Sequence, residues 1–102
     1  MSRTRTHLDL YASARFLKSY IEATPKLQHL AEGAIHDLVN RFRSNPRTVS
    51  HYYDQVAHCK TRILEIDISA GHRLLAHYSK NCLIMLDVGV HEIVGRYGDK
   101  KY

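Results

Sequence analysis

Three stretches near the carboxyl end show the alternation of apolar and polar residues that is typical of β-strands: residues 62–68, 73–78 and 83–91. Two short segments separate them, residues 69–71 and 79–81, and both contain turn-forming Ser with Gly or Asn. Runs of this length joined by such turns predict an antiparallel meander of two hairpins.

Successive side chains of a strand point to opposite faces of a sheet, so strict alternation assigns every residue of the meander to a face. It predicts one apolar face, with Leu64, Ile66, Ile68, Leu74, Ala76, Tyr78, Ile84, Leu86, Val88 and Val90. It predicts an opposite face that is open and polar, with Glu65, Asp67, Arg73, His77, Asp87 and His91. Because antiparallel sheets often expose one face to water, a merely solvated polar face is the alternative interpretation.

Two helices are predicted before the meander, after residues 7–11, which alternate weakly and could form a short strand. The first helix follows Ser13, a suitable N-cap, and continues to about Ala23, where Thr-Pro ends it. The second helix, at residues 26–43, has the strongest helical periodicity in the chain, through Leu27, Leu30, Ala31, Ala34, Ile35, Leu38, Val39 and Phe42.

The order β-α-α-β-β-β predicts the α+β class, with two antiparallel helices packed on a curved, mainly antiparallel sheet in two layers. The apolar helix faces would cover the apolar face of the sheet. A length of 102 residues suits one core, so we expect a single domain over residues 1–102.

Charge and cysteine content narrow the class of protein further. The 15 basic and 10 acidic residues give a net charge of +5, which favours an anionic partner such as nucleic acid. No apolar stretch follows the basic amino end, and no stretch is apolar for long enough to span a membrane. Cys59 and Cys82 have no CxxC spacing, so we expect reduced thiols in a cytoplasmic protein.

The segment at residues 47–60 has no clear period, and a short strand or a helical turn near residues 52–56 are both open. It is rich in aromatic and cationic side chains, which could stack on bases and pair with phosphates. Alternatively, its tyrosines could fill the edge of the core while its histidines face water. The eight histidines of the chain lack the convergent spacing that zinc needs. We therefore expect no metal and no other cofactor.

The order of the elements, together with two local motifs, resembles the RelE/ParE toxins of bacterial type II toxin–antitoxin systems. The motifs are Gly-His-Arg-Leu-Leu-Ala-His-Tyr at residues 71–78 and Leu-Asp-Val-Gly-Val-His at residues 86–91, with Asn45-Pro46 after the second helix. The resemblance covers nearly the whole chain and implies the two-layer fold predicted above. It also implies a cytoplasmic toxin that a cognate antitoxin protein neutralises in a hetero-oligomer.

RNA-cleaving members of this family cut mRNA at the ribosome without a metal, so the resemblance implies a ribosome-dependent mRNA endoribonuclease that blocks translation. Arg73 would clamp the scissile phosphate, because a guanidinium forks onto two oxygens. His91 would transfer a proton near neutral pH. Tyr97 and His58 would complete the catalytic set, and the RNA-binding residues would be Lys60, Arg62, His77 and Arg96.

Two other functions remain open at this point. Some members of the family inhibit DNA gyrase and cut nothing, and a regulatory relative would bind only antitoxin and operator DNA. Asp67 and Asp87 put negative charge on the face that the resemblance assigns to RNA, and the lysine pair of some members is present only as Lys60 with Arg62.

Overall fold

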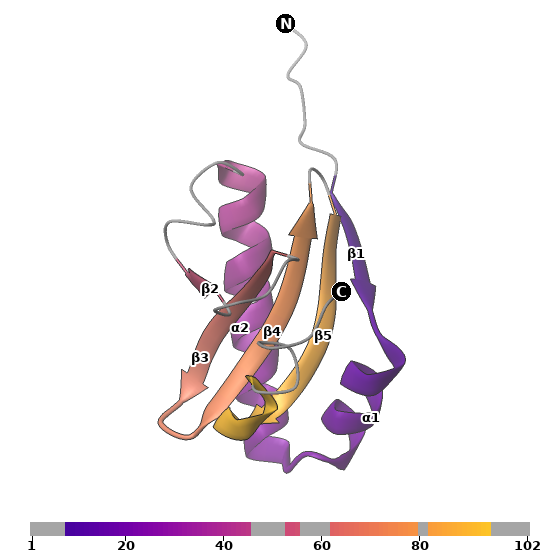
Figure 1. Ribbon diagram of the computed structural model, residues 1–102, viewed down its shortest axis with the longest axis vertical. Helices are drawn as coiled ribbons and strands as arrows, with labels where there is room; N and C mark the ends of the chain where they lie inside the picture. Colours follow the sequence, from indigo (N-terminus) through magenta and orange to yellow (C-terminus); the bar gives the residue numbers. More distant parts are fainter. Residues whose placement is uncertain (1–7, 46–52, 56–61, 80–81, 95–102) are drawn as a thin grey trace, which may run out of the picture.

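The computed structural model describes residues 8–45, 53–55, 62–79 and 82–94. These residues form an α+β arrangement in which helices pack against one sheet (Figure 1). In chain order the elements are β1 (Asp9–Ala12), α1 (Ala14–Glu22), α2 (Pro25–Ser44), β2 (Asp54–Gln55), β3 (Ile63–Ser69), β4 (His72–Ser79), β5 (Cys82–Val90) and the 3₁₀-helix η2 (His91–Val94).

The sheet has five strands in the order β1-β5-β4-β3-β2. β3, β4 and β5 form the predicted antiparallel meander, and β2 adds an antiparallel edge strand. β1 joins the other edge in parallel with β5, from Asp9 opposite Cys82 to Ala12 opposite Met85. The predicted α+β class and mainly antiparallel sheet are therefore confirmed. Of the two possibilities near residues 52–56, the structure has the short strand.

Both helices begin at side-chain caps, of which the sequence analysis predicted Ser13. The Ser13 hydroxyl accepts a hydrogen bond of 3.0 Å from the Phe16 N–H, and the Thr24 hydroxyl accepts one of 3.2 Å from the Leu27 N–H. Pro25 at the first position of α2 lacks an N–H that would otherwise be unsatisfied. The two helix boundaries lie within about one residue of those predicted from periodicity.

A polar contact also joins the two helices. The Tyr20 hydroxyl of α1 donates a hydrogen bond to the Glu32 carboxylate of α2. This hydrogen bond is the main reason that the pKa of Tyr20 lies above its ordinary value. The Gln28 side-chain amide adds a 2.8 Å bond to the Tyr20 carbonyl, so the end of α1 is tied to the first turns of α2.

The main core lies between the helices and one face of the sheet. α2 contributes Ala31, Leu38 and Phe42, and α1 contributes Phe16. The sheet contributes Leu64, Ile66, Leu74, Ala76, Tyr78, Leu83, Met85 and Val88. The predicted apolar faces of β3 and β4 are therefore confirmed.

The prediction for β5 was right for Val88, which lies in the main core, but wrong for Ile84 and Leu86, because this strand contains a bulge. Leu75 lies opposite Asp87 and Ala76 lies opposite Met85, so Leu86 is an extra residue in the pairing. An extra residue reverses the alternation beyond it. Leu83 and Met85 consequently face the main core, whereas Leu86 packs on the other side of the sheet.

The opposite face is also less open and less polar than predicted. Ile63 of β3, Leu75 of β4 and Ile93 of η2 form a second buried cluster there, with Leu86 against it. Gly89 makes room for this contact, since a Cβ atom at its position would lie 3.3 Å from the Ile93 side chain. η2 thus covers part of the face that alternation had left to solvent (Figure 1).

Candidate functional site

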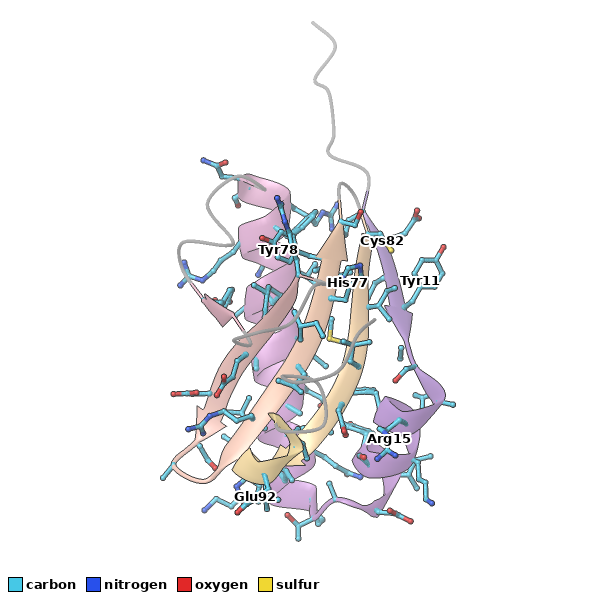
Figure 2. The ribbon with its side chains drawn as sticks, in the orientation of Figure 1. Tyr11, Arg15, His77, Tyr78, Cys82 and Glu92 are labelled. Atoms are coloured by element: carbon cyan, nitrogen blue, oxygen red, sulfur yellow. The ribbon has the colours of Figure 1, made fainter. Side chains whose placement is uncertain are left out.

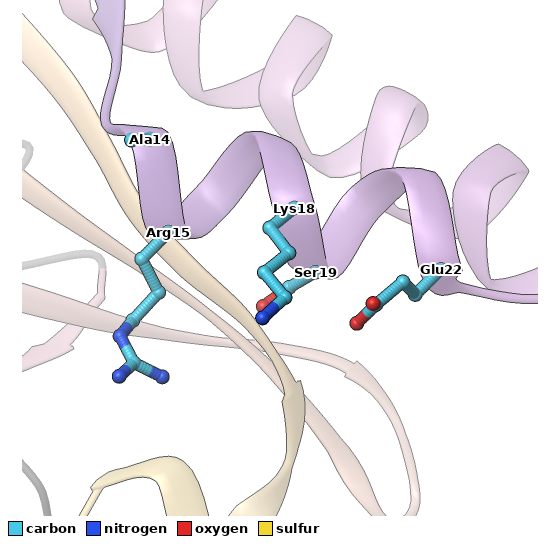
Figure 3. A pocket seen from close by; sticks show the side chains of 5 residues that line it. All are labelled: Ala14, Arg15, Lys18, Ser19 and Glu22. Atoms are coloured by element: carbon cyan, nitrogen blue, oxygen red, sulfur yellow. The ribbon is translucent and has the colours of Figure 1, made fainter.

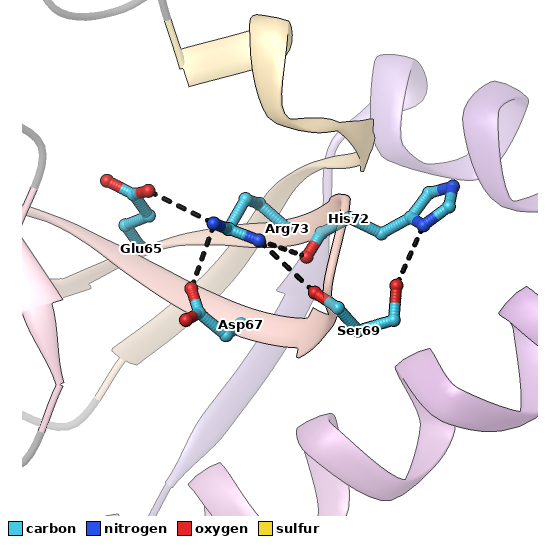
Figure 4. A network of polar contacts seen from close by, with 5 residues as sticks. All are labelled: Glu65, Asp67, Ser69, His72 and Arg73. Atoms are coloured by element: carbon cyan, nitrogen blue, oxygen red, sulfur yellow. Dashed lines mark hydrogen bonds and ion pairs between the residues drawn. The ribbon is translucent and has the colours of Figure 1, made fainter.

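Arg73 on β4 is the centre of a polar network on the face opposite α2 (Figure 4). Its side chain alternates with the core residue Leu74, which places it on this face. Its Nε lies 2.8 Å from an Asp67 carboxylate oxygen and 3.3 Å from a Glu65 carboxylate oxygen. Its Nη1 donates to the carbonyls of Ser69 and His72, at 3.2 and 2.9 Å.

These contacts engage Nε and Nη1 of the guanidinium and tie it to the β3–β4 hairpin. The side chains of Arg73 and Glu65 are only 15% and 19% exposed, so solvent screens this pairing weakly. The Asp67 side chain is 69% exposed, so solvent screens its pairing with Arg73 much more strongly. Nη2 makes no hydrogen bond with the part of the chain that the structure describes, so its two donors remain for a ligand. The charges of one arginine and two carboxylates sum to −1, which works against phosphate binding.

His77 shares this face, but Arg62 does not. The Arg62 guanidinium carbon lies 5.9 Å from the centroid of the Tyr78 ring, which belongs to the main core on the α2 side. His77 is half-buried, and its Nδ1 lies 2.9 Å from the Arg62 carbonyl oxygen. The Cα atoms of His77 and Arg73 are about 13 Å apart, because a strand rises about 3.3 Å per residue.

His91 is the first residue of η2, and its backbone follows Val90, which lies opposite His72 in the β4–β5 pairing. Its side chain lies outside the described part of the structure, so its approach to Arg73 stays a prediction. Four other predicted site residues lie outside the described residues altogether: His58, Lys60, Arg96 and Tyr97.

Asp87 does not lie on an open surface as predicted. Its side chain is completely buried, and one carboxylate oxygen accepts hydrogen bonds from the Ser19 hydroxyl at 3.0 Å and from the Val88 N–H at 2.9 Å. The bulge and α1 together enclose it, because α1 packs over this end of β5. Asp87 therefore ties α1 to the sheet and presents no charged surface to a ligand.

Sequence reasoning missed a hollow beside α1 with a volume of about 420 Å³ (Figure 3). Among the described residues it is lined by Ala14, Arg15, Lys18, Ser19 and Glu22. In Figure 2, Arg15 lies beside β5, at the end of the sheet nearer Glu92, whereas His77 lies toward the other end. One feature of the sequence could have indicated a cationic site here: the first turn of this helix contains Arg15 and no acidic residue.

The structure offers no protein ligand set for a metal within the described residues: they contain no group of three or more His, Cys, Asp or Glu side chains placed to hold an ion. None of the described helices is long and apolar enough to cross a membrane. Comparison of the sequence with models of protein families gives no match, and neither does comparison with curated proteins.

Proposed function

We propose that this protein is a toxin of the RelE/ParE type, a metal-independent mRNA endoribonuclease that acts on the ribosome. The proposal is supported by the chain order, in which two helices precede the meander and α2 covers one face of the sheet. The observation that carries it is the position of Arg73. It lies on the face opposite α2 and pairs with Gly89, two residues before His91.

The substrate strand of RNA lies along this face in the proposed reaction. The Nη2 donors of Arg73 bind a non-bridging oxygen of the scissile phosphate, while Glu65 and Asp67 hold the guanidinium in place. The 2′-oxygen loses its proton and attacks the adjacent phosphorus, and the bond to the 5′-oxygen breaks as that oxygen gains a proton. His91 carries out one of these two proton transfers.

The remaining predicted residues have supporting roles. Tyr97 and His58 assist catalysis, and Lys60, Arg96 and His77 contact the RNA strand. Arg62 reaches the RNA only from the edge of the sheet, since its guanidinium stacks over Tyr78. We further propose that a cognate antitoxin neutralises the toxin in a cytoplasmic hetero-oligomer.

A second candidate function is a non-enzymatic toxin that inhibits DNA gyrase, or an inactive relative that binds only antitoxin. One observation favours it. Arg73 is already engaged by two carboxylates and two backbone carbonyls, which is the arrangement of a residue that stabilises a hairpin. The two carboxylates weaken the attraction of Arg73 for phosphate.

The experiment that tests the proposal is induced expression without antitoxin, followed by pulse labelling of new protein and primer-extension mapping of transcripts. We expect rapid translation arrest and new 5′ ends within coding regions. His91→Ala removes the proton-transfer group, so arrest and cleavage should both fall by at least about 100-fold, the usual contribution of such a group. The folded state is checked by circular dichroism.

His36→Ala is the matched control, because His36 is exposed on α2, on the far side of the sheet, where its ring hydrogen-bonds only with Asn40 among the described residues. It should arrest translation as the wild type does. DNA damage with intact transcripts would favour the gyrase function instead. Harmless expression would favour the inactive relative, and undiminished cleavage by His91→Ala would remove His91 from the reaction.

A further inference from the structure

The side of α1 that carries Ser19 borders the same face of the sheet as Arg73. Ser19 donates its hydroxyl proton to Asp87, and Asp87 lies opposite Leu75 in the β4–β5 pairing. Leu75 packs in the second cluster, with Ile93 of η2, on the face away from α2. Arg15 lies one helical turn before Ser19 and lines the same hollow, so it belongs to this side of the molecule.

Arg15 and Lys18 bring two uncommitted positive charges to the hollow (Figure 3). Both residues are exposed, and neither makes a hydrogen bond or an ion pair within the described part of the chain. The position of Arg15 does not serve helix stability. Arg15 lies in the first turn, where the positive end of the helix dipole disfavours a cation and favours an anion.

The contrast with Arg73 indicates which charges are free to bind a ligand. Arg73 faces two carboxylates, whereas the described residues that line the hollow include two cations and one carboxylate, Glu22, whose charges sum to +1. Its volume of about 420 Å³ falls within the range of about 300–1,000 Å³ that is usual for small-ligand sites. The positive charge and the volume of the hollow therefore suit an anionic ligand of moderate size.

We propose that the hollow beside α1 binds backbone phosphates of single-stranded RNA through the guanidinium of Arg15 and the ammonium of Lys18. The identity of the ligand as RNA rests on the proposed function. The α1 site extends the path of the strand from Arg73 across β5 to α1, and it supplies positive charge that is not offset by two carboxylates as that of Arg73 is.

The test is binding of a fluorescently labelled, 2′-O-methyl RNA oligonucleotide, which cannot be cleaved, measured by anisotropy at several salt concentrations. For Arg15→Ala with Lys18→Ala we expect about tenfold weaker binding at low salt. We also expect the slope of log K against log salt to become shallower by about 1.4, because each phosphate contact contributes about 0.7 on single strands. Glu22→Gln should strengthen binding, because it removes a negative charge that lines the hollow.

The matched control is Lys26→Ala with Arg43→Ala, which removes the same charge from exposed positions on α2. It should leave the salt slope unchanged. Equal losses in the two double variants, an unchanged affinity for Arg15→Ala with Lys18→Ala, or no binding by the wild type would overturn the α1 site. Binding that depends on Arg15 and Lys18 in a protein that cuts no RNA would support the α1 site and contradict the nuclease.

Discussion

Asp87 shows how one buried carboxylate can join parts of the chain that are distant in sequence. It accepts hydrogen bonds from Ser19 of α1 and from its own neighbour Val88, and its side chain has no exposed surface. A buried charge is tolerated only when such donors compensate it. The position of α1, and with it the hollow, therefore depends on this residue.

Asp87→Ala should lower the free energy of unfolding by roughly 2–3 kcal/mol, because it leaves the half-buried Ser19 hydroxyl and the buried Val88 N–H without their acceptor. Urea denaturation measures the change. Asp67→Ala is the control, since the Asp67 side chain is 69% exposed and an exposed ion pair contributes about 0–1 kcal/mol. Equal losses in the two variants would show that Asp87 does not hold α1 in place.

At the scale of elements, the local periodicity of this chain predicted the helices and hairpins well. The stripe from Leu27 to Phe42, the cap Ser13 and the Thr24-Pro25 stop are local signals, and the structure follows them. Local periodicity could not predict the bulge at Leu86. Nothing in a continuous apolar run shows which of its residues is left out of the pairing with the neighbouring strand. The packing of η2 on Leu75 depends on the tertiary fold and was missed for the same reason.

Ser13 joins two elements at the bulge as well as capping α1. Its hydroxyl accepts from Phe16 and donates to the Leu86 carbonyl at 2.9 Å, and its N–H donates to the Met85 carbonyl at 2.9 Å. Ser13→Ala should therefore cost about 2 kcal/mol, as the sum of a cap and one further hydrogen bond.

Thr24→Ala removes only a cap, on α2, and should cost about 1 kcal/mol. Thermal and urea unfolding of the two variants give the comparison. A cost for Thr24→Ala that equals or exceeds that of Ser13→Ala would contradict the role of Ser13 as a link between α1 and β5.

At the scale of the whole molecule, the two faces of the sheet have different roles. The α2 side buries the main core, and the other side carries the small second cluster, the Arg73 network and the α1 hollow. Alternation predicted correctly that Arg73 and His77 share a face. It did not predict that Arg15 and Lys18 of α1 lie on this side of the molecule. In the sequence they resemble the charged residues of any solvated helix, and only the hydrogen bond between Ser19 and Asp87 shows how α1 is oriented.

The most direct test of the proposed ribosome-dependent cleavage of mRNA uses purified protein and ribosomes programmed with one defined mRNA. The protein should cut the mRNA in the codon of the ribosomal A site and leave a 2′,3′-cyclic phosphate on the upstream fragment, and His91→Ala should leave the mRNA whole. Intact mRNA after incubation with wild-type protein that is shown to be folded would contradict the proposed function.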